Sequence, residues 1–124
     1  MEDPNKIQSV QPEEEGLTSD YANNALFVGT IWDLKILFGE LSATNRGVDW
    51  HTSITMPWEL AKLLAYYLEI NLAARELAHG TIRVPESMTP PEPQPPSESE
   101  NNPAMQRLVS FIKERREQFL NTMK

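Results

Sequence analysis

The sequence predicts an α+β fold: an antiparallel three- to four-stranded meander packed on one long helix, followed by a Pro-rich linker and a C-terminal amphipathic helix. Three observations predict this fold. Apolar and polar residues alternate through two stretches between residues 32 and 54, which is the period of a strand with one buried face. Residues 57–78 then carry apolar side chains at helical spacing. Seven prolines, from Pro85 to Pro103 inclusive, separate that stretch from a second amphipathic one.

We expect strands over residues 21–56. The first is short and contains strand formers at residues 26–28, and Gly29 begins a turn or bulge. Two longer strands follow, and the residues expected to share one face of each are Trp32, Leu34, Ile36 and Phe38 in one strand and Val48, Trp50, Thr52 and Ile54 in the next. Because the loop 42–47 between them is short, they should be antiparallel. Gly39 should weaken or bend its strand, and residues 81–84 could add a fourth.

A long helix is expected from Pro57 to Ala78. Proline suits the first helical position because it has no N–H, and Gly80 is the usual residue just after a helix end. Apolar residues cover about two-thirds of the circumference, whereas a surface helix needs a stripe only about 100° wide. One short sheet cannot cover that much, so a symmetry-related helix is the simplest further partner. Small residues would allow close approach, and the predicted oligomer interface is Ala61, Ala65, Leu68 and Leu72.

Composition sets the domain boundaries. Residues 1–20 are polar and predict a disordered acidic arm, with an acidic docking peptide as the alternative. Residues 21–84 form the α+β domain, residues 85–102 an extended linker without a core, and residues 103–124 a helix with Asn102 as its N-cap. This helix could dock on its own sheet, on a second subunit or on another protein. The partner-binding face predicted for it is Met105, Leu108, Val109, Ile112, Phe119 and Leu120.

Charge and composition disfavour several classes of partner. The net charge of −7 argues against nucleic acid and anionic membranes, which both require clustered Lys and Arg. The absence of cysteine excludes disulfides, thiolate nucleophiles and Cys-rich zinc sites. The acidic N-terminus lacks the apolar segment of a signal peptide, and no stretch reaches about 18 consecutive apolar residues. We therefore expect a cytoplasmic protein that binds neither nucleic acid nor membrane.

Few residues have catalytic potential. His51 is expected on a strand, facing away from Trp50 and Thr52 as a surface histidine, and His79 lies at a helix end. Asp33 is interpreted as a turn carboxylate that accepts backbone N–H groups. No histidine pair has metal-ligand spacing, and we predict no enzyme activity, no cofactor and no metal. A place in the core is favoured over a pocket for the three tryptophans, Trp32, Trp50 and Trp58.

Three segments within residues 20–84 form a recognisable pattern. They are Tyr21-Ala22-Asn23-Asn24, then Trp32-Asp33-Leu34-Lys35-Ile36-Leu37-Phe38-Gly39, then Thr55-Met56-Pro57-Trp58-Glu59-Leu60-Ala61-Lys62-Leu63-Leu64. Together they resemble the DUF3467 domain family of short bacterial and archaeal proteins of unknown function. The resemblance implies a bacterial protein and supplies no activity or catalytic residues. The order of strands before a long helix is also similar in topology to the export chaperone SecB, which oligomerises and holds unfolded clients.

These observations favour a non-enzymatic oligomeric protein-binding or adaptor module. We expect a homodimer with a further, unidentified protein partner for the C-terminal helix. One alternative is a SecB-like holdase that binds unfolded clients. A second alternative is a small-ligand-binding domain or enzyme, which would require His51, Asp33 and the tryptophans to converge on one pocket.

Overall fold

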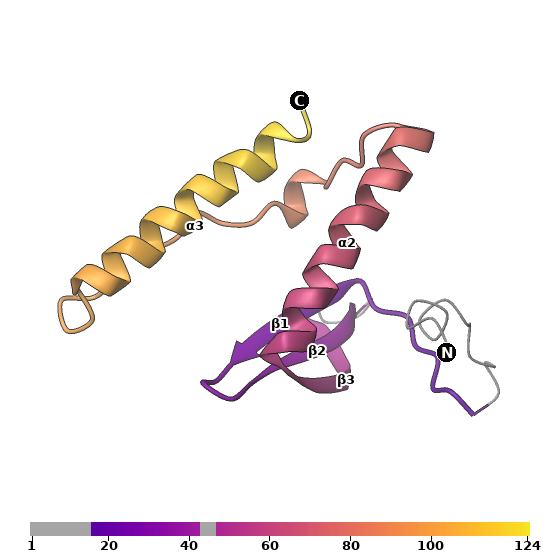
Figure 1. Cartoon of the computed structure of the whole chain (residues 1–124), viewed down its shortest axis with the longest axis horizontal. Coiled ribbons are helices and arrows are strands. Elements are labelled where there is room, and N and C mark those ends of the chain that lie inside the picture. The colour runs from indigo at the N-terminus through magenta and orange to yellow at the C-terminus, as the bar shows by residue number, and fades with distance from the viewer. Residues whose placement is uncertain (1–15, 43–46) are drawn as a thin grey trace, which may run out of the picture. The chain divides into compact units, whose positions relative to one another are not determined.

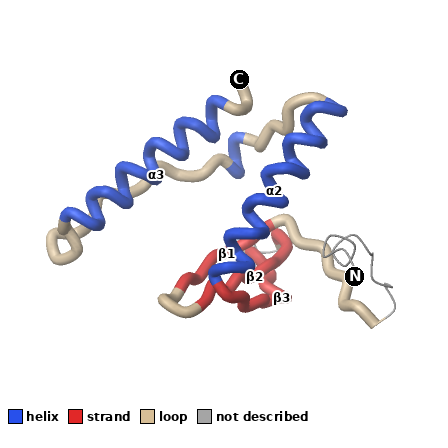
Figure 2. The backbone as a smooth tube through the Cα atoms, viewed as in Figure 1, coloured by secondary structure: helices blue, strands red, loops and turns tan. Residues whose placement is uncertain are grey.

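The computed structural model describes residues 16–42 and 47–124 and confirms the α+β class (Figures 1 and 2). The chain divides into two compact units, Met1–Leu64 and Ala65–Lys124. Its elements are β1 (Asn24–Gly29), β2 (Asp33–Leu41), β3 (Val48–Pro57), α2 (Trp58–His79), a 3₁₀ turn at Glu86–Met88 and α3 (Pro103–Asn121).

Among the described residues the sheet has three strands, and residues 81–84 form none, so the fourth strand was a wrong prediction. Of the acidic arm predicted over residues 1–20, residues 1–15 lie outside the described residues.

The sheet is an antiparallel meander in the order β1-β2-β3, in which β2 is central. On β2, Ile36 lies opposite Phe27 of β1 and Ile54 of β3. Partners in register share a face, so one side of the sheet carries a continuous apolar row. Ile36 and Met56 are 8% and 5% exposed, and they are the only buried hydrophobic residues in the described part of the chain. The core that this sheet builds is therefore very small.

A β-bulge interrupts the pairing of β2 with β3 next to Gly39. Phe38 lies opposite Thr52 whereas Gly39 lies opposite Trp50, so His51 is an extra residue on β3. A bulge puts two residues against one and reverses the alternation beyond it. Val48 and Trp50 therefore lie on the opposite face from Thr52 and Ile54, and the prediction that all four share one face was wrong.

Gly39 is required by the close approach of β3. A Cβ atom at this position would lie 2.6 Å from the Asp49 carbonyl oxygen, 2.8 Å from Val48 Cγ1 and 3.0 Å from Trp50 Cε3. The sequence predicted that Gly39 would weaken or bend its strand, and the bulge occurs at this point. The absence of a side chain here allows β3 to approach and bulge.

The turn between β1 and β2 is closed by Thr30. Its backbone N–H donates to the Asp33 carbonyl oxygen (2.8 Å), and its hydroxyl oxygen accepts from the N–H groups of Trp32 and Asp33, both at 3.1 Å. The Asp33 carboxylate instead accepts from the Thr30 hydroxyl, at 3.0 Å. The backbone-binding role predicted for Asp33 therefore belongs to Thr30.

Trp58, the first residue of α2, fastens the helix start to this turn. Its indole Nε1 donates to the Thr30 carbonyl oxygen (2.9 Å), and its ring lies over Gly29, where a Cβ atom would be 3.1 Å from the ring. Pro57 ends β3, so the helix begins one residue later than predicted. The strand-to-helix junction is thus held by one polar and one apolar contact.

The ends of both helices follow local sequence signals. Gly80 has a positive φ of 92° and its N–H donates to Glu76 O (2.8 Å), which confirms it as the residue that ends α2. The Asn102 side chain accepts from Met105 N (2.9 Å), which confirms it as the N-cap of α3. Pro103 follows at the first helical position, where its missing N–H costs nothing.

Candidate protein-binding surfaces

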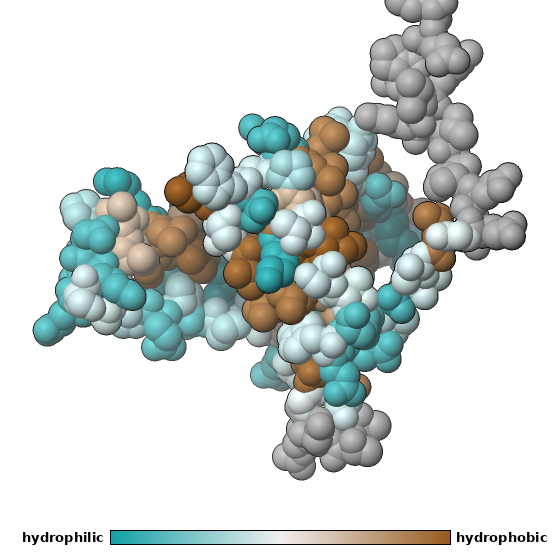
Figure 3. Space-filling view, turned by 90° about the horizontal axis from the view of Figure 1, so that it is seen from below, coloured by the Kyte–Doolittle hydropathy of each residue, from teal (hydrophilic) through white to brown (hydrophobic). Residues whose placement is uncertain are grey.

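Helix α2 exposes its apolar side chains. None of its residues is buried. Leu68 on the predicted interface is 60% exposed, and Leu77 near the other end is 89% exposed. The remaining large apolar residues that α2 exposes are Trp58, Leu60, Leu63, Leu64, Tyr66, Tyr67, Ile70 and Leu72. Hydrophobic side chains gather in broad areas on the face drawn in Figure 3. Contiguous apolar areas of this kind mark interaction sites on folded proteins.

The tryptophans do not form a core. Trp32, at the tip of the β1–β2 turn, is 82% exposed, and its neighbour Ile31 is equally open. Trp50 and Trp58 are each exposed to more than a third of their surface. The prediction that these rings form the core was wrong, because two of them lie at a turn or a junction and the bulge turns Trp50 to the other face of the sheet.

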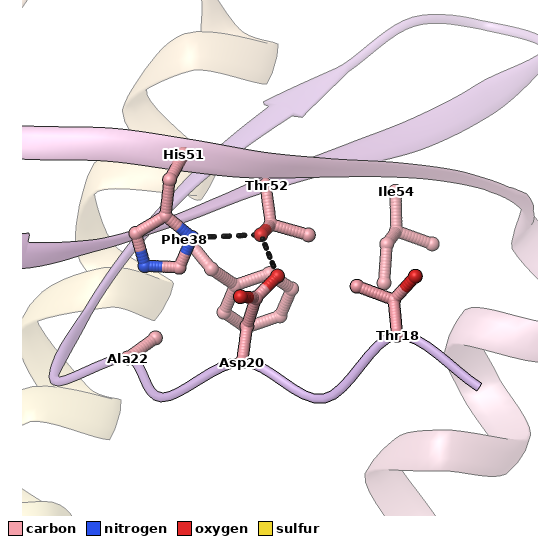
Figure 4. A pocket seen from close by; sticks show the side chains of 7 residues that line it. All are labelled: Thr18, Asp20, Ala22, Phe38, His51, Thr52 and Ile54. Carbon is pink, nitrogen blue, oxygen red and sulfur yellow. Dashed lines mark hydrogen bonds between the residues drawn. The ribbon is translucent and has the colours of Figure 1, made fainter. Parts of the chain in front are cut away.

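A pocket of about 610 Å³ lies where β3 bulges (Figure 4). His51 and Thr52 both point toward the chain segment 18–22, which runs alongside the strand. They face the same way because the bulge places two successive side chains on one side, so the prediction that His51 faces away from Thr52 was wrong. The residues that line the pocket are Thr18, Asp20, Ala22, Phe38, His51, Thr52 and Ile54.

A chain of hydrogen bonds ties segment 18–22 to β3. The Thr52 hydroxyl donates to Asp20 Oδ2 (2.9 Å), and His51 Nδ1 lies 2.7 Å from the same hydroxyl oxygen. His51 Nε2 lies 2.9 Å from the Tyr21 carbonyl oxygen, with Glu40 Oε1 at 3.9 Å. The Thr52 hydroxyl gives its one hydrogen to Asp20, and the donor and acceptor roles of the two His51 nitrogens depend on the tautomer of the ring. We call these contacts the His51 latch.

The geometry of the His51 latch favours a structural role, which is to hold segment 18–22 against β3, over a catalytic one. Both ring nitrogens and the Thr52 hydroxyl are already engaged with protein atoms, which leaves no free base beside a nucleophile. Asp33 lies at the far end of β2, in register with Pro57 rather than with the bulge. His51, Asp33 and the tryptophans therefore do not converge on one pocket, as the ligand-binding or enzyme alternative required.

Replacing Thr52 with valine tests the latch. The variant keeps the side-chain shape but removes the hydroxyl that joins Asp20 to His51, so segment 18–22 should loosen. We expect a loss of about 1 kcal/mol of unfolding free energy, as for one hydrogen-bonded hydroxyl, and faster amide hydrogen exchange in a peptide covering residues 16–24. Thr55→Val is the control, because Thr55 is exposed on the same strand. Equal exchange in both variants would contradict the latch.

Within the second unit, the segment after α2 contacts α3. The Arg83 guanidinium donates to the Met123 carbonyl oxygen (2.7 Å), and Arg116 Nε donates to the Pro90 carbonyl oxygen (2.9 Å). Glu92 lies 3.9 Å from the Arg116 guanidinium. The first part of the predicted linker is therefore docked on α3 rather than free of it.

The predicted partner face of α3 divides into two sets. Met105, Val109 and Leu120 are half-buried, whereas Leu108 and Ile112 are exposed. Phe119 lines a pocket of about 420 Å³ together with Leu72 of α2 and Ile82. Two residues assigned from the sequence to different surfaces, Leu72 and Phe119, thus meet inside one unit. Phe111, which was not among the residues predicted for this face, adds to the exposed set at 57%.

The described residues form neither a metal site nor a membrane span. Across residues 16–42 and 47–124, no group of three or more His, Asp or Glu side chains is placed to hold a metal ion. In the same part of the chain, no helix combines the length and the apolar character needed to cross a membrane.

Comparison with protein-family models, with curated proteins and with solved structures gives no match. The resemblance to the DUF3467 family and the topological likeness to SecB stay predictions.

Proposed function

We propose that the chain is a non-enzymatic oligomeric protein-binding module. The observation that carries this proposal is a contrast within the described part of the chain, between a core of two buried apolar residues and a 22-residue helix that buries none. Burial of apolar surface is the main favourable term in folding. A chain of 124 residues that leaves this much of it open gains stability when another protein covers it.

The size of α2 matches what a protein interface needs. Its 22 residues span about 33 Å at 1.5 Å per residue. Its large apolar side chains, about half exposed, present an area on the order of the 800 Å² that each partner contributes to a standard interface. The surface is thus large enough for a specific complex.

A second copy of the chain is the first partner that we propose. The flank formed by Ala61, Ala65, Leu68 and Leu72 carries no charge, so two copies can meet there despite a net charge of −7 on each. Leu72 lines the pocket beside Phe119 but keeps 51% of its surface exposed for this contact. Alanines let helix axes approach closely while leucines fill the space between them. Two-fold symmetry presents the same flank from both sides. Exposed Leu108, Phe111 and Ile112 of α3 would remain for a different protein partner.

The mass of the full chain in solution tests this proposal. Size exclusion with light scattering at micromolar concentration should give a mass of at least two copies of the 14.1 kDa chain. A mass of one copy throughout the micromolar range would remove the oligomeric module as the function.

A holdase is a second candidate, because α2 exposes apolar residues beyond one flank. Leu60, Leu63 and Leu64 form a stripe of their own, and all three are exposed. A surface that stays open after self-association could hold an unfolded client. The chain should then suppress heat-induced aggregation of a test protein at several-fold molar excess. No suppression at that excess would leave the specific binding module as the only candidate.

A further inference from the structure

The two edges of the sheet differ in how they are protected. Edge strands expose unpaired backbone groups, and proteins protect them with charges, prolines, bulges or covering segments. On β3, Asp49 supplies charge, His51 forms the bulge and Pro57 ends the strand. Residues 20–21 are also fastened to β3 by the His51 latch. A charge, a proline, a bulge and a covering segment therefore all protect this edge from pairing with a further strand.

The edge strand β1 lacks these protective features. Its sequence, Asn-Ala-Leu-Phe-Val-Gly, contains no charge and no proline, and its pairing with β2 is regular from end to end. Phe27 in the middle is 63% exposed, and Leu26 and Val28 on either side are also exposed. An uncharged, regular and apolar edge strand is the kind to which another strand adds.

The hydrogen-bond pattern shows which groups of β1 face outward. The Thr30 N–H donates to the Asp33 carbonyl oxygen, which makes Thr30 and Asp33 a hydrogen-bonded pair. Such pairs alternate along an antiparallel ladder, so Val28 and Leu26 bond to β2 in turn. The N–H and C=O groups of Ala25, Phe27 and Gly29 then point away from β2. No hydrogen bond to the backbone of these three is found in the described part of the chain beyond the ladder itself.

We propose that β1 pairs antiparallel with β1 of a second copy, about a two-fold axis at Phe27. This inference rests on the proposed oligomeric function and names the surface through which two sheets join. Phe27 would lie opposite its own copy, and Ala25 opposite Gly29 on each side of it. These are the three residues whose backbone groups point outward, so every outward group finds a partner. The result is one continuous sheet of six strands.

The side chains of β1 favour its own copy as the occupant. In this register the bulky Phe27 pair is flanked by Ala25, whose small side chain leaves space beside the rings, and by Gly29, over which the Trp58 ring of the same chain lies. On the other face, Leu26 lies opposite Val28, an apolar pair of the kind that stabilises cross-strand neighbours. No charged residue of either copy is brought opposite a like charge along the strand, although each chain carries −7.

A single cysteine at position 27 tests the axis, because the chain has none of its own. In a hydrogen-bonded antiparallel pair the Cα atoms are about 5.5 Å apart, within the range of a disulfide. Full-length Phe27→Cys should therefore become a covalent dimer on mild copper-phenanthroline oxidation. Leu26→Cys is the matched control, since its two copies would be roughly 8 Å apart, beyond that range. We expect Phe27→Cys to crosslink at least tenfold faster. Equal rates, or faster crosslinking at position 26, would overturn the proposed pairing.

Full-length Phe27→Lys separates this inference from the proposed function. Lysine at this exposed edge position should leave the circular dichroism of the chain unchanged. In the proposed pairing it would lie opposite the lysine of the second copy, and the two positive charges would repel each other. We expect a tenfold or greater loss of association through the sheet, seen as a smaller mass by light scattering. If the wild type is oligomeric and Phe27→Lys keeps its full mass, the β1 pairing is wrong and the proposed function stands. A wild type of one copy would overturn both.

Discussion

Replacing Gly39 with alanine is expected to cost about 3 kcal/mol of unfolding free energy, the upper end for overpacking at a site that cannot relax. The added Cβ would lie 2.6 Å from the Asp49 carbonyl oxygen, which is a backbone atom of the paired strand. Relief requires β3 to move away, which breaks the register on both sides of the bulge. Because this loss is a large fraction of the roughly 5–15 kcal/mol by which native proteins are stable, the urea midpoint of the variant should lie well below that of the wild type.

Gly29→Ala is the matched control for this prediction. Its Cβ would lie 3.1 Å from the Trp58 ring, which is the end of a side chain and can shift by a few tenths of an ångström. We expect a loss of about 1 kcal/mol, typical of a tolerated surface or junction change. Equal urea midpoints for the two alanine variants would show that the approach of β3 at Gly39 is not what holds the bulge.

Replacing Leu68 with glutamate is expected to weaken association through the α2 flank by at least about 100-fold. A fully buried leucine contributes roughly 1.5–3 kcal/mol, and a two-fold contact loses two of them, while 1.4 kcal/mol is a factor of ten. Leu68 is 60% exposed within one chain and does not line the pocket beside Phe119. The substitution should therefore act on the complex rather than on the protomer. Dissociation constants from sedimentation equilibrium provide the measurement.

Leu77→Glu provides the comparison for Leu68→Glu. Leu77 belongs to the same helix and is 89% exposed, but it lies outside the flank. The same change of charge should therefore leave the dissociation constant within a factor of about three, since isolated surface substitutions alter stability by less than about 0.5 kcal/mol. If both variants weaken association equally, net charge and not the flank controls it.

Local signals in the sequence were enough to predict the order of the elements and several of their ends. Strand alternation in residues 34–38 survives in the structure because those residues pair in register on both sides of β2. Gly80 and Asn102 end and begin their helices through bonds with residues three or four positions away. Interactions over such short distances depend on neighbouring residues alone, so a sequence pattern contains them.

The bulge could not be predicted in the same way. It depends on how two strands far apart in the sequence approach at Gly39, and alternation in β3 continued through it without interruption. One extra residue turned His51 to the side of Thr52 and moved Trp50 to the other face. The latch with Asp20 was missed for the same reason, because its hydrogen bond spans 32 positions. Only Gly39 itself gave a signal in the sequence.

The exposed tryptophans show a second limit of sequence reasoning. Large aromatic residues in a small domain are normally core residues, and nothing in the pattern around Trp32 or Trp58 indicates otherwise. The structure places Trp32 at a turn tip and Trp58 on the outside of a junction. In the proposed function this surface is available to a partner, as the apolar side chains of α2 are.

If the core is completed between copies, the stability of the chain must depend on its concentration. For a chain whose folding is coupled to association, stability rises with protein concentration by mass action. We expect the urea midpoint of the full chain to increase steadily as its concentration is raised from the low to the high micromolar range. A midpoint that stays constant across that range would show that the chain folds and remains stable as a single copy, and that no second copy completes its core.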